Sequence, residues 1–131
     1  MAGLKVMMVS SMDDRHLPQM MTDGNERTFW ISTGMYPQEI LLELPQGQGG
    51  AKPPRGIQIS STGIRVLQVE ASTGPAPINF ERLQDVELPN RSGGLQTETI
   101  ALAGGSWRYL RLRVARGWSD FCSVHKLLLM L

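Results

Sequence analysis

The sequence has two histidines, His16 and His125, and one cysteine, Cys122, which could serve as a base and a nucleophile. Nucleophilic catalysis requires a nucleophile, a base and an orienting group within hydrogen-bonding reach of one another. Cys122 and His125 are three positions apart in the expected last strand, and residues at an odd separation face opposite sides of a strand. The sequence also lacks the Gly-x-Ser-x-Gly, phosphate-loop and dinucleotide-binding motifs. We therefore predict that the protein is not an enzyme and that His125 is a polar residue at a strand edge.

A second group of polar residues begins with Asp23-Gly24-Asn25. Glycine tolerates a positive φ, and Asp and Asn side chains bond to the backbone two residues on, so this run predicts a tight turn. The run does not begin an EF-hand, because the twelfth position counted from Asp23 is Gly34 and not glutamate. Taken alone, these residues are explained by the chemistry of a turn.

Aromatic and basic residues alternate along the most regular expected strand, at positions 107 to 114. Trp107, Tyr109, Arg111 and Arg113 share one face, and the residues at positions 110, 112 and 114 are aliphatic. Aromatic residues and arginine are enriched at the centres of protein interfaces, which makes this face a candidate partner-binding surface. The alternative is the outer face of a sandwich, with arginine stems covering the rings.

The elements that must position these residues are short strands separated by glycine, proline and asparagine turns. One short helix is expected at Pro18, and the segment from Pro45 to Gly56 is predicted to be a surface loop. Trp30, Phe121 and Val124 are expected in the core. The expected strands cover residues 4–9, 38–44, 57–60, 64–71, 95–102 and 107–114, with a last strand within 117–131. On the expected strands, Leu67 and Val69 should face inward, Ile100 and Leu102 should share one face, and Leu110, Leu112 and Val114 should share another.

The bulky β-formers at positions 28–31 and the apolar residues of ambiguous spacing at 78–83 bring the expected number of short strands to eight or nine. Eight or nine short strands without a long helix predict an all-β protein, an antiparallel β-sandwich. Periodicity alone does not separate a jelly roll from an immunoglobulin-like topology.

Composition excludes several classes of protein. The 131 residues predict a single domain, 1–131. A formal charge of +1 is too small to drive unspecific binding to nucleic acid or to an anionic membrane. Cys122 is the only cysteine, which excludes an internal disulfide and is consistent with a reducing compartment. No apolar run is long enough to cross a bilayer, and we expect a cytosolic protein.

The polar turn also carries a family resemblance. The pattern Asp23-Gly24-Asn25-x-x-Thr28-x-Trp30 resembles a loop of galactose-binding-like, discoidin-type jelly rolls. The longer run T-F-W-I-S-T-G-M-Y-P-Q-E resembles the intraflagellar transport protein 25 family, small subunits of the intraflagellar transport B complex. Further matches are His16-Leu17-Pro18, Leu95-Gln96, Tyr109-Leu110-Arg111 and Asp120-Phe121-Cys122-Ser123-Val124-His125. The resemblance implies a jelly roll of galactose-binding-domain-like type.

The resemblance further implies a ligand and a partner. Family members bind calcium at this loop, which corresponds here to Asp23, Thr28 and carbonyl groups around Asn25 and Met20. The implied partner is a small Rab-like GTPase, intraflagellar transport protein 27, bound as a heterodimer within the transport B complex. The implied role is cargo transport in cilia or flagella. The alternative function is that of a calcium-dependent carbohydrate-binding domain of discoidin type.

Overall fold

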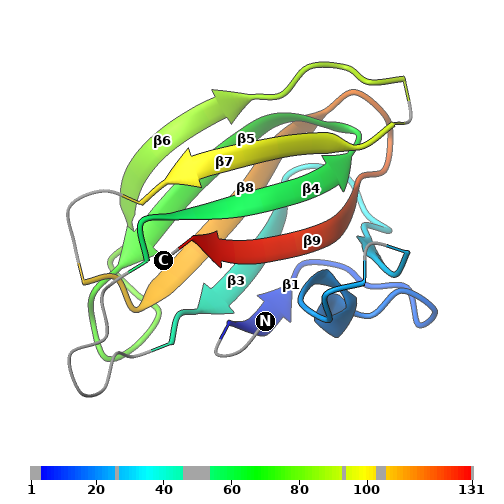
Figure 1. The fold of residues 1–131 in the computed structure, drawn as a ribbon. Coiled ribbons are helices and arrows are strands. Elements are labelled where there is room, and N and C mark those ends of the chain that lie inside the picture. Colours follow the sequence, from blue (N-terminus) through cyan, green and yellow to red (C-terminus); the bar gives the residue numbers. More distant parts are fainter. Residues whose placement is uncertain (1–3, 26, 46–53, 93, 103–105, 131) are drawn as a thin grey trace.

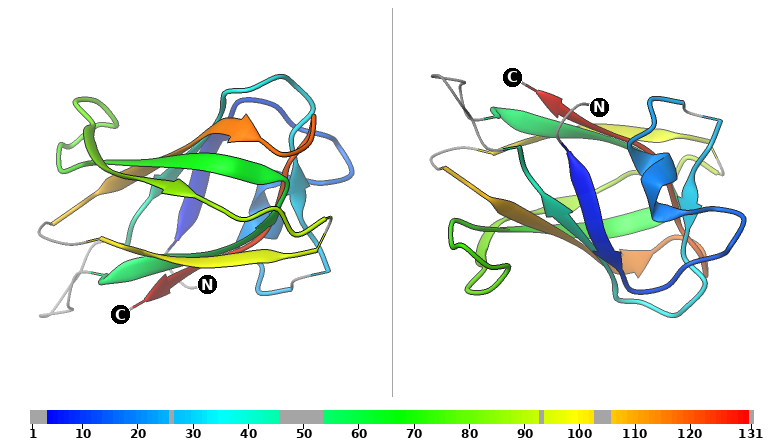
Figure 2. Two further views of the ribbon diagram at one scale, coloured as in Figure 1. Left: turned by 90° about the horizontal axis from the view of Figure 1, so that it is seen from above. Right: turned by 90° about the horizontal axis from the view of Figure 1, so that it is seen from below.

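The computed structural model describes residues 4–25, 27–45, 54–92, 94–102 and 106–130. Its strands form two antiparallel sheets that pack face to face (Figure 1). The five-stranded sheet contains, in order, β1 (Lys5–Val9), β3 (Gln38–Glu43), β8 (Tyr109–Gly117), β5 (Ile64–Ser72) and β6 (Glu81–Glu87). The four-stranded sheet contains, in order, β2 (Trp30–Ile31), β9 (Ser123–Met130), β4 (Gly56–Thr62) and β7 (Gln96–Ala101). Figure 2 shows the two sheets edge-on as two layers.

The core lies between the two layers and is built by strand alternation. On β8, Leu110 and Leu112 stand opposite Leu42 and Ile40 of β3, and Leu112 also stands opposite Val69 of β5. All five side chains are fully buried. Full burial of an aliphatic side chain contributes about 1.5–3 kcal/mol relative to exposure, so the central strands dominate the stability of this layer.

Trp30 anchors the other layer, as its sequence context predicts. The indole is fully buried, and its Nε1–H donates a hydrogen bond of 2.8 Å to the carbonyl oxygen of Ser11. This bond satisfies the one polar atom that a buried tryptophan would otherwise leave unpaired. It also fixes the loop after β1 against the two-residue strand β2.

Most of the expected elements are confirmed. The 3-10 helix η1 (Pro18–Met21) begins at Pro18, and each expected strand overlaps an observed one. The inward-facing residues predicted on these strands are buried: Leu67, Val69, Ile100, Leu102, Leu110, Leu112, Val114 and Val124. The loop predicted at positions 45 to 56 lies mostly outside the described residues.

The core assignment of Phe121 is wrong. Its side chain is 53% exposed, because β9 begins only at Ser123 and Phe121 still belongs to the loop after β8. Cys122, one position later, is buried in the core instead. Within the part of the chain that the structure describes, no helix has the length and apolar character needed to cross a membrane.

Candidate functional site

The polar turn predicted at Asp23 is closed by its own side chains. Gly24 has a φ of 78°, and the backbone N–H of Asn25 donates to Asp23 Oδ1 over 2.9 Å. The hydroxyl of Thr28 lies within hydrogen-bonding distance of the Asp23 carboxylate and is 2.9 Å from the carbonyl oxygen of Asn25. The backbone N–H of Arg27 donates to the Asn25 side-chain oxygen over 3.0 Å. The turn therefore gathers a carboxylate, a hydroxyl and a carbonyl oxygen at one point.

All of these donor atoms are oxygens, the ligand type that hard cations such as calcium prefer. Calcium takes six to eight oxygen ligands, and loop carbonyls can supply several of them. Met20, the fourth residue implied by the family resemblance, lies in η1, where its N–H donates to the Leu17 carbonyl over 3.0 Å. No cluster of three or more His, Cys, Asp or Glu side chains occurs among the described residues. A calcium site here would therefore depend on one carboxylate, Asp23, with neutral oxygens around it.

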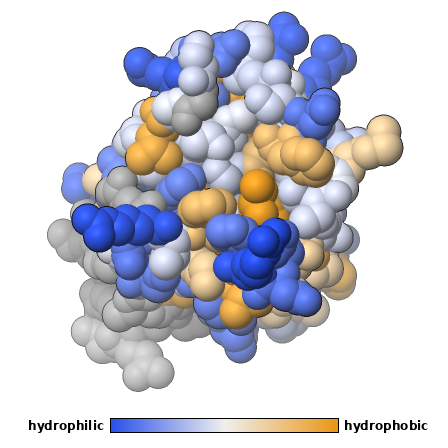
Figure 3. Space-filling model, turned by 90° about the vertical axis from the view of Figure 1, so that its right-hand side faces the viewer, coloured by the Kyte–Doolittle hydropathy of each residue, from blue (hydrophilic) through white to orange (hydrophobic). Residues whose placement is uncertain are grey.

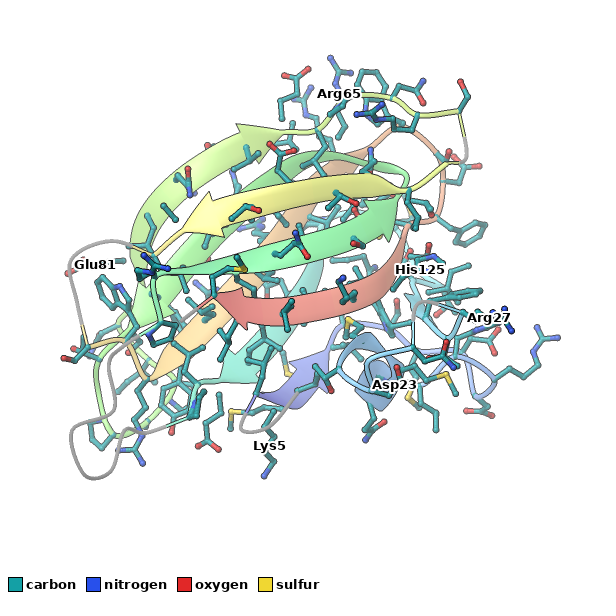
Figure 4. The ribbon with its side chains drawn as sticks, viewed as in Figure 1. Lys5, Asp23, Arg27, Arg65, Glu81 and His125 are labelled. Atoms are coloured by element: carbon teal, nitrogen blue, oxygen red, sulfur yellow. The ribbon has the colours of Figure 1, made fainter. Side chains whose placement is uncertain are left out.

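Three aromatic rings next to this turn form a stack that sequence reasoning missed. The ring of Phe29 lies between His16 and His125, with centroid distances of 4.2 Å and 4.6 Å. Figure 4 shows Asp23, Arg27 and His125 at one end of the molecule, with Glu81 at the opposite end. The stack connects three parts of the chain: the segment after β1, which carries His16; the segment between the Asp23 turn and β2, which carries Phe29; and β9, which carries His125.

A β-bulge in β9 turns His125 toward Phe29. Ser60 pairs with Lys126 while Ser61 pairs with Val124, so His125 is the extra residue. Bulges re-aim a side chain in this way. His125 lies just beyond the two residues of β9 that pair with β2, Ser123 and Val124, and the ring of Phe29 stacks on its imidazole.

The possible nucleophiles near His125 are buried. Ser123 Oγ is 3.0 Å from His125 Nε2, but the serine is only 5% exposed and its hydroxyl also lies 2.5 Å from Thr62 Oγ1. Cys122 lies in the core with its sulfur 3.7 Å from Ser32 Oγ. Burial raises the pKa of the Cys122 thiol and disfavours the reactive thiolate. Neither group has the access that a substrate would need.

The aromatic and basic face of β8 is largely engaged by the protein itself. Arg111 Nε donates to Glu70 Oε1 over 2.8 Å, and its guanidinium lies 4.4 Å from the centroid of the Phe80 ring. The Glu70 carboxylate raises the pKa of Arg111. Tyr109 is only 4% exposed, and its hydroxyl donates to the Pro75 carbonyl over 3.3 Å.

The other two residues of this face, Trp107 and Arg113, are partly buried. In the described part of the chain, Trp107 Nε1 and Arg113 Nε have no hydrogen-bond partner. Arg113 stands between Glu39 of β3 and Gln68 of β5 in the strand register. Trp107 precedes β8 and packs against the hydrophobic core, so it is not part of the strand face that the sequence predicted for it. The binding role of the four residues stays a prediction.

Comparison with known proteins gives sequence relatives over nearly the whole chain. The chain is 34% identical to the human intraflagellar transport protein 25 homologue over 94% of its own length and 83% of the relative. It is 36% identical to intraflagellar transport protein 25 of Chlamydomonas reinhardtii over 95% of its length and 63% of the relative. No model of a protein family matches the sequence.

Solved structures that share the fold include carbohydrate-binding modules. The family 32 module of Clostridium perfringens NanJ, in complex with galactose, matches 96% of this chain and 92% of its own, with a TM-score of 0.75 and 14% identity. A second family 32 module from Clostridium perfringens, in complex with GalNAc-β-1,3-galactose, matches 98% and 95%, with a TM-score of 0.74 and 20% identity. These likenesses confirm the galactose-binding-like β-sandwich and do not extend to the ligand.

Proposed function

The chain belongs to the intraflagellar transport protein 25 family, and we propose that it is a non-enzymatic subunit of the intraflagellar transport B complex. In this proposal it forms a heterodimer with a small Rab-like GTPase, intraflagellar transport protein 27. The heterodimer supports cargo transport in cilia or flagella. The single observation that carries the proposal is the identity of 33–36% to three family members over about 95% of the chain.

The arrangement of the possible nucleophiles supports a role without catalysis. Ser123 is buried beside Thr62, and the Cys122 thiol is buried in the core. A binding subunit needs only a rigid surface, which two packed sheets provide. The alternative function is that of a discoidin-type lectin. It rests on the likeness to sugar-binding modules, and likeness in fold alone does not carry function.

Recovery of partners from a ciliated cell extract tests the proposal. The tagged protein is used as bait, and the retained proteins are identified and quantified by mass spectrometry. We expect a Rab-like GTPase in an amount near that of the bait, together with other transport B subunits. Retention on galactose or fucose matrices without any such GTPase would instead favour the lectin.

We further propose that calcium braces the Asp23 turn in the assembled protein. The ligands would be the Asp23 carboxylate, the Thr28 hydroxyl and the carbonyl groups of Asn25 and Met20. The convergence of the first three oxygens supports this proposal. With one carboxylate, the affinity should be modest, because charge count and rigidity tune calcium binding. Calorimetric titration with calcium tests the site, and heat of dilution alone would contradict it.

A further inference from the structure

Two exposed apolar side chains border one hollow at the loop end of the sandwich. Met35, between β2 and β3, is 87% exposed, and Phe121, between β8 and β9, is 53% exposed. Both line a hollow of about 440 Å³ together with Tyr36 and Asp120. Figure 3 views this side of the molecule and shows apolar colour gathered near its middle, with hydrophilic side chains around it. We call the residues Met35, Tyr36, Asp120 and Phe121 the Phe121 surface.

A second hollow also borders Phe121. It measures about 300 Å³ and is lined by Asp13, Ile31 and Ser32, with Thr33 shared between the two hollows. Phe121 therefore lines both hollows. Hollows bordered by an exposed apolar side chain can accept the anchoring side chains of a protein partner.

The walls of the larger hollow are held in place by the fold. The Tyr36 hydroxyl donates to the Ser119 carbonyl over 2.7 Å, across the loop that carries Phe121. Gly117 leaves room for this ring, since a Cβ there would lie 2.1 Å from the Tyr36 hydroxyl oxygen. On the other side, the Thr33 N–H donates to Ser11 Oγ over 3.0 Å. A surface fixed in this way loses little conformational entropy when a partner binds.

The charged side chains that line the hollows indicate which partner side chains would complement them. The carboxylates that line them are Asp120 in the larger hollow and Asp13 in the smaller one. Arg15 bonds to Asp13 and lowers the pKa of that carboxyl, so Asp13 is already partnered. Asp120 forms no ion pair within the described ranges of the chain. A basic side chain next to an apolar anchor would therefore complement the Phe121 surface.

We infer that the Rab-like GTPase subunit docks on the Phe121 surface, with an apolar side chain beside Phe121 and a lysine or arginine facing Asp120. This inference rests on the proposed function. The face of β8 offers a partner less free surface. Arg111 already contacts Glu70 and Phe80, and Tyr109 is buried. Met35 and Phe121, in contrast, expose apolar area that a partner can cover.

The test measures binding of the recombinant GTPase subunit to purified variants by calorimetry. Phe121→Ser and Asp120→Lys should each weaken binding at least about tenfold, as expected for an anchor and its charged neighbour at an interface centre. The matched control is Ile78→Ser, which removes an apolar side chain of 59% exposure from the loop between β5 and β6. The control should bind within about twofold of the wild type. Equal melting temperatures of all variants show that each is folded.

The outcomes separate the two proposals. If the wild type binds the GTPase and Phe121→Ser and Asp120→Lys bind it with the same affinity, the docking inference is overturned and the proposed heterodimer stands. No binding of the wild type would overturn the proposed heterodimer, and the docking inference with it. Retention of the wild type, but not of Phe121→Ser, on immobilised galactose would assign the Phe121 surface to a glycan and overturn docking of a protein.

Discussion

Replacement of Phe29 by alanine removes the middle ring of the stack with His16 and His125. Its two ring contacts have centroid distances of 4.2 Å and 4.6 Å. Aromatic pairs contribute about 0.5–1.5 kcal/mol each beyond the burial of area, so the two contacts together amount to about 1–3 kcal/mol. Loss of the partly buried ring adds about 1 kcal/mol. We expect Phe29→Ala to lower the free energy of unfolding by about 2–4 kcal/mol.

Thermal unfolding followed by circular dichroism measures this loss. For a chain of this length, each kcal/mol corresponds to about 3 °C, so the melting temperature should fall by about 6–12 °C. Phe121→Ala is the matched control: it makes the same deletion at the same end, in a side chain that is 53% exposed. The control should lose less than about 1 kcal/mol. Equal melting temperatures for the two variants would refute the idea that the stack joins the loops to β9.

Three further predictions concern the same end of the molecule. Calcium at about 1 mM should raise the melting temperature of the wild type but not of Asp23→Ala; a wild type that ignores calcium contradicts the site. Gly117→Ala should displace the Tyr36 ring, because a Cβ at this position would lie 2.1 Å from the Tyr36 hydroxyl oxygen. Urea unfolding should show a free energy of unfolding that is lower by about 1–3 kcal/mol. An unchanged urea midpoint would contradict the close packing of Tyr36 against Gly117. Burial raises the pKa of Tyr36, so its contribution to the free energy of unfolding should be fully present below the ordinary pKa of about 10 and should be lost as the pH rises above that value. Tyr36→Phe should lessen this loss of stability at high pH, and an equal loss in both proteins would contradict the role given to Tyr36.

Strand alternation made much of the fold predictable. Leu110 and Leu112 face the core because β8 lies inside its sheet with one face on the core, and such a strand shows a period of two residues. The turn at Asp23 was predictable for a different reason: Gly24 and the neighbouring polar residues act over only a few positions. Signals that depend on local chemistry are visible in a sequence.

Other features depend on contacts between distant residues. Phe121 is apolar and precedes a strand, and nothing local tells it apart from the core residues Cys122 and Val124. The stack requires positions 16, 29 and 125 to meet, which depends on the bulge in β9. Glu70 engages Arg111 across 41 positions of the chain, through a strand register that the sequence alone does not reveal.

Size-exclusion chromatography with light scattering, applied to the full chain coexpressed with the Rab-like GTPase subunit, tests the central claim most directly. If the chain is the partner of that GTPase, the two proteins should elute together in one peak, with the mass of one copy of each. Two separate peaks, each with the mass of its own protein, would contradict the heterodimer and with it the proposed role in the transport complex.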